Sequence, residues 1–101
     1  MKIEFLEPAK IEFDNAVSYY EGEQEGLGIR FKNEIRSSID RVIKFPYLYP
    51  IIEDSIRKCV AHSFPYTIFY VIENETIYVY AIANHFRDPS ILADRFKEKE
   101  K

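Results

Sequence analysis

The spacing of apolar side chains predicts a strand and then two helices in the first half of the chain. Residues 2–6 alternate polar and apolar positions, and Pro8 suits the first turn of a following helix. From residue 9 to about residue 23, and again after Gly26-Leu27-Gly28, apolar residues recur every three or four positions. The second helix should end at Phe45-Pro46, because helical backbone is disfavoured before proline. The two stripes are Phe13, Val17 and Tyr20, and Phe31, Ile35, Ile39 and Val42.

Three strand-like runs follow, at residues 55–62, 66–73 and 76–84. Asn74-Glu75 suits a two-residue turn between the last two runs. With that turn, Glu73 faces Thr76, Tyr70 faces Val79 and Ile68 faces Ala81 across the hairpin. The pattern therefore predicts an α+β fold in the order β-α-α-β-β-β, with an antiparallel sheet packed on an antiparallel helical hairpin.

This register assigns the side chains of the hairpin to two faces. The face expected to pack on the helices carries Tyr66, Ile68, Tyr70, Ile72, Ile77, Val79, Ala81 and Ala83. The opposite face carries Thr67, Phe69, Val71, Tyr78, Tyr80 and Ile82. An apolar face turned away from the core usually marks a partner site, so we expect a protein-binding groove formed by Phe69, Val71, Tyr78 and Tyr80. The alternative is that residues 90–96, with Ile91, Leu92 and Phe96, fold back over these side chains; the sequence leaves both open.

Composition limits the class of protein. A chain of 101 residues with 47% hydrophobic content is expected to form one domain, residues 1–96, followed by a charged tail at 97–101. The lone Cys59 cannot form an internal disulfide, and the chain has no apolar signal-like block at its start, so a cytoplasmic location is expected. Its apolar runs are too short to span a membrane. A net charge of −3 weighs against avid nucleic-acid binding.

Five basic side chains are the candidates for catalysis, namely Arg57, Lys58, His62, His85 and Arg87. Cleavage of RNA would need a base near neutral pH and cations that stabilise the developing phosphate charge. The spacing of these residues does not mark them as a unit, and ordinary surface charge is the competing interpretation. No spacing typical of metal ligands is present, so no metal or other cofactor is expected. Asp88 and Pro89 fit a helix start instead, and Cys59 fits a small strand residue.

The motifs together resemble the RelE/ParE superfamily of bacterial toxins, and specifically its ParE-like branch, which includes plasmid stabilisation proteins. The similarity extends over most of the chain. The residues that match the first half of the family are Ala16, Tyr19-Tyr20, Gly26-Leu27-Gly28, Arg30-Phe31, Ile39 and Phe45-Pro46-x-Leu48-Tyr49-Pro50. Those that match the second half are Phe64-Pro65-Tyr66, the alternation of Ile68, Tyr70 and Ile72, and His85-x-Arg87-Asp88-Pro89.

The resemblance implies the toxin half of a type II toxin–antitoxin pair, wrapped by an antitoxin that adds a helix and an extended tail. Three hypotheses follow from it. ParE-like relatives inhibit DNA gyrase and have no recognised catalytic set, so the first is a protein-binding toxin. RelE-like relatives cut mRNA on the ribosome, so the second is an endoribonuclease; however, this chain is acidic and lacks the terminal strand with Tyr or His that those enzymes use. The third is an inactive relative that only binds its antitoxin.

Overall fold

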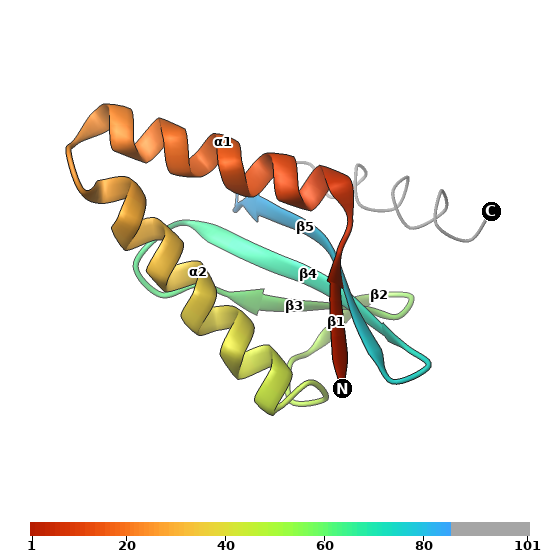
Figure 1. The fold of residues 1–101 in the computed structure, drawn as a ribbon. Helices are drawn as coiled ribbons and strands as arrows, with labels where there is room; N and C mark the ends of the chain where they lie inside the picture. Colours follow the sequence, from red (N-terminus) through yellow and green to blue (C-terminus); the bar gives the residue numbers. More distant parts are fainter. Residues whose placement is uncertain (86–101) are drawn as a thin grey trace.

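The computed structural model describes residues 1–85, in which two helices cover one face of a five-stranded sheet (Figure 1). Its elements are β1 (Lys2–Phe5), α1 (Glu7–Glu23), α2 (Leu27–Lys44), β2 (Ile51–Glu53), β3 (Ile56–Val60), β4 (Tyr66–Glu73) and β5 (Thr76–Asn84). The expected α+β class and the order of strand, two helices and strands are confirmed.

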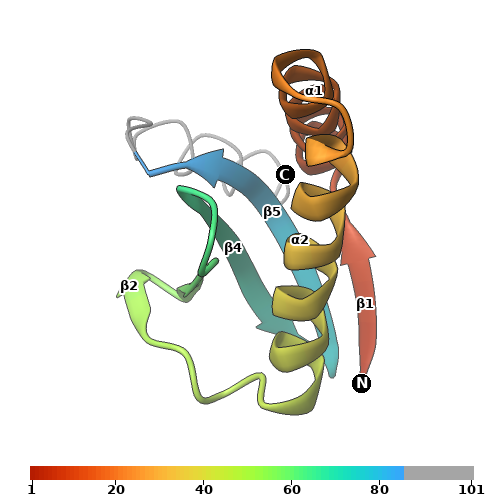
Figure 2. The same cartoon turned by 90° about the vertical axis from the view of Figure 1, so that its left-hand side faces the viewer.

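The sheet differs from the expected one in two respects. Its order is β1-β5-β4-β3-β2, so a short strand, β2, which the hydrophobic pattern did not predict, forms the edge opposite β1 (Figure 2). The sheet is also mixed, because β1 runs parallel to β5 while the remaining pairs are antiparallel. A parallel neighbour needs a long crossover connection, and here the chain between β1 and β5 supplies it.

The hairpin between the helices depends on a close approach at Gly28. Gly28 is already inside α2, and an added Cβ there would lie 2.8 Å from the backbone oxygen of Val17. Glu21 holds the connection in place, since its carboxylate accepts bonds of 3.0 Å from the backbone N–H groups of Gly26 and Gly28. These N–H groups belong to the start of α2, where a negative charge is favourable.

The core lies between the helices and the sheet. Phe31, Ile35 and Val42 of α2 are buried as their spacing predicts. The buried residues of β3, β4 and β5 that pack in the same cluster are Cys59, Ile68, Tyr70, Ile77, Val79 and Ile82. Phe13, Val17 and Tyr20 of α1 are partly buried at its margin. The apolar stripes of both helices therefore face the sheet, and the predicted core is confirmed apart from Ala81 and Ala83 in the last part of β5.

The turn between β4 and β5 has the predicted two residues. Asn74 and Glu75 have φ values of 49° and 60°, and positive φ at both central residues is typical of the type I′ turn that suits a hairpin. Glu73 pairs with Thr76 and Tyr70 with Val79, as predicted. A turn of this type is favoured because its twist matches that of the flanking strands. Here the pair Asn-Glu occupies the two central positions in place of the more usual Asn-Gly.

Beyond Tyr70 the predicted register is wrong. Phe69 pairs with Ala81 and Ile68 with Ile82, so β5 contains one extra residue, Tyr80, at a β-bulge. A shift of one residue reverses the faces of the strand. Ile82 therefore packs in the core under the helices, whereas Ala81 and Ala83 lie with Phe69 on the other face.

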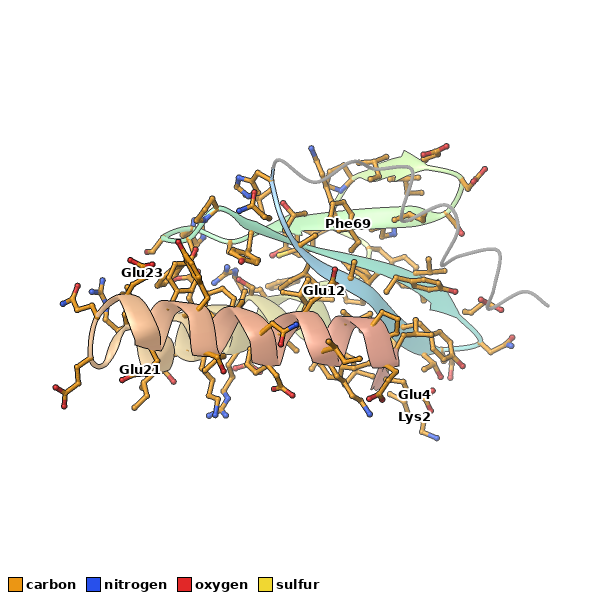
Figure 3. All side chains as sticks on the ribbon, turned by 90° about the horizontal axis from the view of Figure 1, so that it is seen from above. Lys2, Glu4, Glu12, Glu21, Glu23 and Phe69 are labelled. Atoms are coloured by element: carbon orange, nitrogen blue, oxygen red, sulfur yellow. The ribbon has the colours of Figure 1, made fainter. Side chains whose placement is uncertain are left out.

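The strand edge next to α1 has a polar contact that was not expected. β1 ends at Phe5, so the backbone N–H of Ile82 lies beyond the reach of its ladder. The carboxylate of Glu12 accepts a bond of 3.1 Å from this N–H, on the side of α1 that faces β5 (Figure 3). A helix side chain therefore accepts the hydrogen bond of a strand N–H group that the sheet leaves without a neighbouring strand.

Candidate partner-binding surface

The sheet face turned away from the helices carries an apolar cluster, as the sequence predicts. We call it the outer face and define it by Phe69, Val71, Tyr78 and Tyr80. Ile56 and Leu6 pack in the same cluster, and neither α1 nor α2 contributes a side chain to it. The four residues come from β4 and β5, where they occupy neighbouring positions of one hairpin.

Burial within the outer face is uneven. Val71 and Tyr80 are each 1% exposed, so the prediction that all four side chains form an open patch is wrong for these two. Phe69 and Tyr78 are only partly buried, and Figure 3 shows Phe69 on the sheet, remote from α1. Phe69 and Tyr78 are thus the members of the set that a partner can reach first. The alternative covering by residues 90–96 lies outside the described residues.

Strand β3 extends the accessible part of this face. Lys58 pairs with Phe69 and Val60 with Thr67, and side chains of paired residues lie on the same side of a sheet. Lys58 is exposed, and 46% of Val60 is exposed. Sequence analysis assigned Lys58 to possible catalysis and overlooked Val60; the alternation Ile56, Lys58, Val60 was the signal that could have placed both here.

Arg57 has a structural role in the fold. Its guanidinium donates bonds of 3.2 Å and 2.6 Å to the backbone oxygens of Tyr47 and Tyr49 and lies 5.4 Å from the centre of the Tyr47 ring. The neighbouring Tyr70 hydroxyl donates a bond of 2.7 Å to the backbone oxygen of Pro46. Arg57 and Tyr70 therefore hold the segment between α2 and β2 against the sheet.

The two histidines lie at the other end of β4. His62 follows β3 and His85 follows β5, so the two flank Tyr66 at the start of β4. Both side chains are exposed. Arg57 pairs with Tyr70, four residues further along β4, which is about 13 Å at the usual rise of a strand. The structure thus places the histidines at the same end of the sheet, on either side of β4, and away from Arg57. Arg87, Asp88 and Pro89 lie outside the described residues.

Burial changes the titration of Tyr70. Desolvation raises the pKa of this hydroxyl from 10.0 to about 12, and the Arg57 guanidinium opposes the shift. The folded state therefore favours the neutral phenol. The contribution of Tyr70 to stability is present in full below pH 10 and is lost as the pH rises to about 12, because the unfolded chain ionises first.

Tyr70→Phe is expected to lower the free energy of unfolding by about 0.5–1.5 kcal/mol at pH 8, since the backbone oxygen of Pro46 loses its donor. The difference from wild type should then shrink between pH 10 and 12. Urea titrations of both proteins across this range measure it. Burial also raises the pKa values of Tyr20 and Tyr49. Both residues are present in the two proteins, so their effect on the pH dependence cancels in the difference. A constant difference across the range would contradict the assignment.

Cys59 is a buried core residue and not a reactive thiol. It is 1% exposed on the helix side of β3, and burial raises the pKa of its thiol. A protonated thiol is a poor nucleophile. Within residues 1–85 the side chains also bring together no group of three or more His, Cys, Asp or Glu suited to a metal ion. In the same part of the chain, neither helix has the length and apolar character that crossing a membrane requires.

The fold and the outer face together define a small α+β domain in which a helical hairpin covers one face of a mixed sheet and an apolar cluster lies on the other. The comparisons with known proteins identify the family. Residues 3–89 match the family model described as the ParE toxin of type II toxin–antitoxin systems, parDE. The chain therefore belongs to the ParE toxin family. No curated protein matches it.

The fold is also found among solved structures. A chain from the structure titled "Chromosomal ParDE TA system from P. aeruginosa" superimposes with a TM-score of 0.63 and 11% sequence identity, over 83% of this chain and 95% of that one. At this identity the likeness supports the fold and carries no argument about individual residues.

Proposed function

We propose that this protein is a cytoplasmic toxin that binds and inhibits a cellular target such as DNA gyrase, and that a cognate antitoxin neutralises it by covering the outer face. The observation that carries the proposal is an apolar sheet face, away from the helices, on which Phe69 and Tyr78 remain accessible above buried Val71 and Tyr80. Aromatic side chains with a polar tip are enriched at protein interfaces.

The arrangement of the basic residues supports binding over catalysis. General acid–base chemistry needs its groups within hydrogen-bond reach of one reacting centre. Arg57 is engaged by two backbone oxygens, and Lys58 lies beside Phe69 on the outer face. His62 and His85 occupy the opposite end of β4. Ribosome-dependent cleavage of mRNA is the weaker hypothesis for this geometry.

Induction of the protein without its antitoxin tests the proposal. Growth arrest should be accompanied by gyrase-linked DNA breaks or altered plasmid supercoiling, with transcripts intact. The double variant His62→Ala/His85→Ala should arrest growth as strongly as wild type, because both side chains are exposed and lie outside the core cluster. Cut transcripts that depend on these histidines would support the endoribonuclease hypothesis instead, and unchanged growth would support an inactive relative.

A further inference from the structure

A second apolar surface lies on the segment that leads from the end of α2 through β2. Five large apolar side chains of this segment are exposed, and they make up five of the eleven exposed large apolar side chains in residues 1–85. We call them the apolar corner: Phe45, Tyr47, Leu48, Ile51 and Ile52, whose exposed fractions lie between 41% and 71%. None of them packs in the outer face. Exposed apolar side chains gathered in this way usually mark a partner site.

The fold holds the backbone of the apolar corner in place. Arg57 and Tyr70 bind three backbone oxygens of the segment, as described above. The backbone N–H of Lys58 in β3 also donates a bond of 3.1 Å to the backbone oxygen of Pro50. Figure 2 shows the segment leaving α2 and reaching β2 at the edge of the sheet opposite β1. An ordered surface loses less conformational entropy when it binds, so the exposure of these side chains suits recognition of a protein.

The segment around the apolar corner is positive although the protein is acidic. Residues 41–58 contain four Lys or Arg and two Asp or Glu, which gives a local charge of +2 against −3 for the whole chain. The ammonium of Lys44 lies 5.5 Å from the centre of the Phe45 ring, and the guanidinium of Arg57 lies 5.4 Å from that of Tyr47. Opposite charges on two surfaces guide them together, and like charges oppose contact. A partner with carboxylates around an apolar centre fits this surface, whereas a second copy of the chain would bring the same cations together.

The apolar corner adjoins the outer face across two strands. β2 pairs with β3, and β3 pairs with β4, which carries Phe69. Lys58 pairs with Phe69 on one side of β3 and bonds the segment before β2 on the other. Two strand spacings amount to about 10 Å, whereas a standard interface covers about 800 Å² on each partner. A protein bound on the outer face therefore crowds any protein bound at the apolar corner.

We propose that the apolar corner is the surface by which the toxin binds its target, through an acidic surface of the target with an apolar centre. The inference rests on the toxin function proposed above and adds a surface that is separate from the one assigned to the antitoxin. It also gives neutralisation a physical cause, because an antitoxin on the outer face blocks the approach of the target to the neighbouring corner. Tyr47 and Leu48 are the most exposed members of the set and are the anchors that the target buries.

Induction of variants without antitoxin tests the inference. Tyr47→Ser/Leu48→Ser removes the two anchors and keeps the backbone oxygen that Arg57 binds. This corner variant should lose growth arrest, and the concentration that inhibits supercoiling by purified DNA gyrase should rise about 100-fold or more, as for two hot-spot residues. Tyr19→Ser/Ile29→Ser is the matched control, because it removes an aromatic and an aliphatic side chain of similar exposure on α1 and α2. It should arrest growth as strongly as wild type.

Antitoxin binding separates loss of target contact from loss of folding. Calorimetric titration should give the corner variant an antitoxin affinity close to that of wild type, whereas the outer-face variant Phe69→Ser/Tyr78→Ser should lose the antitoxin and still arrest growth. Lys44→Glu tests the charge preference without removing an apolar side chain. It should weaken inhibition several-fold, and Arg30→Glu, at an exposed position near the start of α2, should leave inhibition unchanged. Urea unfolding of each variant checks that it is folded.

The outcomes that contradict the inference differ from those that contradict the toxin function. Growth arrest by the corner variant at the wild-type level would overturn the inference and leave the toxin function standing. A wild type that neither arrests growth nor inhibits gyrase would overturn both. Loss of growth arrest in a folded outer-face variant would place the target on the outer face instead. A wild-type dimer that the corner variant dissociates would show that a second copy of the chain covers the corner.

Discussion

Replacing Phe31 with alanine is expected to lower the free energy of unfolding by about 3–5 kcal/mol. Phe31 is fully buried and lies at the centre of an aromatic cluster. The distances between its ring centre and its neighbours are 6.0 Å to Phe13, 5.2 Å to Tyr20, 5.3 Å to Phe64 and 5.0 Å to Tyr66. Removing the ring therefore leaves a cavity at the point where α1, α2 and the sheet meet.

The size of this effect is best judged against the total free energy of unfolding of the domain. A domain of this length has a free energy of unfolding of roughly 5–15 kcal/mol. Phe31→Ala should therefore remove a large part of this stability and raise the unfolded fraction at 37 °C. Urea denaturation measures the loss. Phe31→Leu is the control, because it keeps most of the apolar volume and should cost clearly less. Equal losses for the two variants would mean that apolar volume retained by leucine does not compensate for the ring, which would contradict the cavity as the main cause of the loss.

Phe69→Ser/Tyr78→Ser is expected to weaken binding of the cognate antitoxin by about 100-fold or more, on the proposal that the antitoxin covers the outer face. Hot-spot residues, which cluster near the centre of an interface, cost about 2 kcal/mol or more each on truncation, and Phe69 and Tyr78 are expected to act as such residues. Because both side chains are only partly buried, the loss in stability should stay smaller than the loss in binding. Calorimetric titration with the purified antitoxin and urea unfolding give the two quantities.

The control for this experiment removes an aromatic ring elsewhere. Tyr19 on α1 is 60% exposed and lies outside the outer face. Tyr19→Ser should therefore leave antitoxin affinity close to that of wild type. If instead Phe69→Ser/Tyr78→Ser unfolds the protein, these rings are part of the core. If it binds normally, the antitoxin uses another surface.

The helices could be predicted from the sequence because their evidence is local and periodic. Phe31, Ile35, Ile39 and Val42 can share a face in only one regular structure, and the structure buries all four. The family resemblance was confirmed over residues 3–89. The evidence for the turn at Asn74-Glu75 was also local, because its two residues alone set the pairing of the strand residues next to it.

The incorrect predictions concern features that depend on contacts between residues far apart in the sequence. Nothing around Tyr80 signals the extra residue that reverses the faces of β5 beyond it. β2 is only three residues long, too short for an alternating pattern to be recognised. Arg57 was considered for catalysis because its charge suits phosphate, but its partners are backbone oxygens eight and ten residues earlier. Such contacts depend on how a loop returns to the sheet, which side-chain periodicity does not encode.

The central claim is that the outer face of the sheet binds the antitoxin, and methyl and aromatic NMR of the complex tests it most directly. Addition of purified antitoxin to the labelled protein should shift the Phe69 and Tyr78 ring signals and the methyl signals of Val60 and Val71, with Ile35 and Val42 in the helix-facing core changing little. Large shifts in the core residues or on α1, with the outer-face signals unmoved, would contradict it.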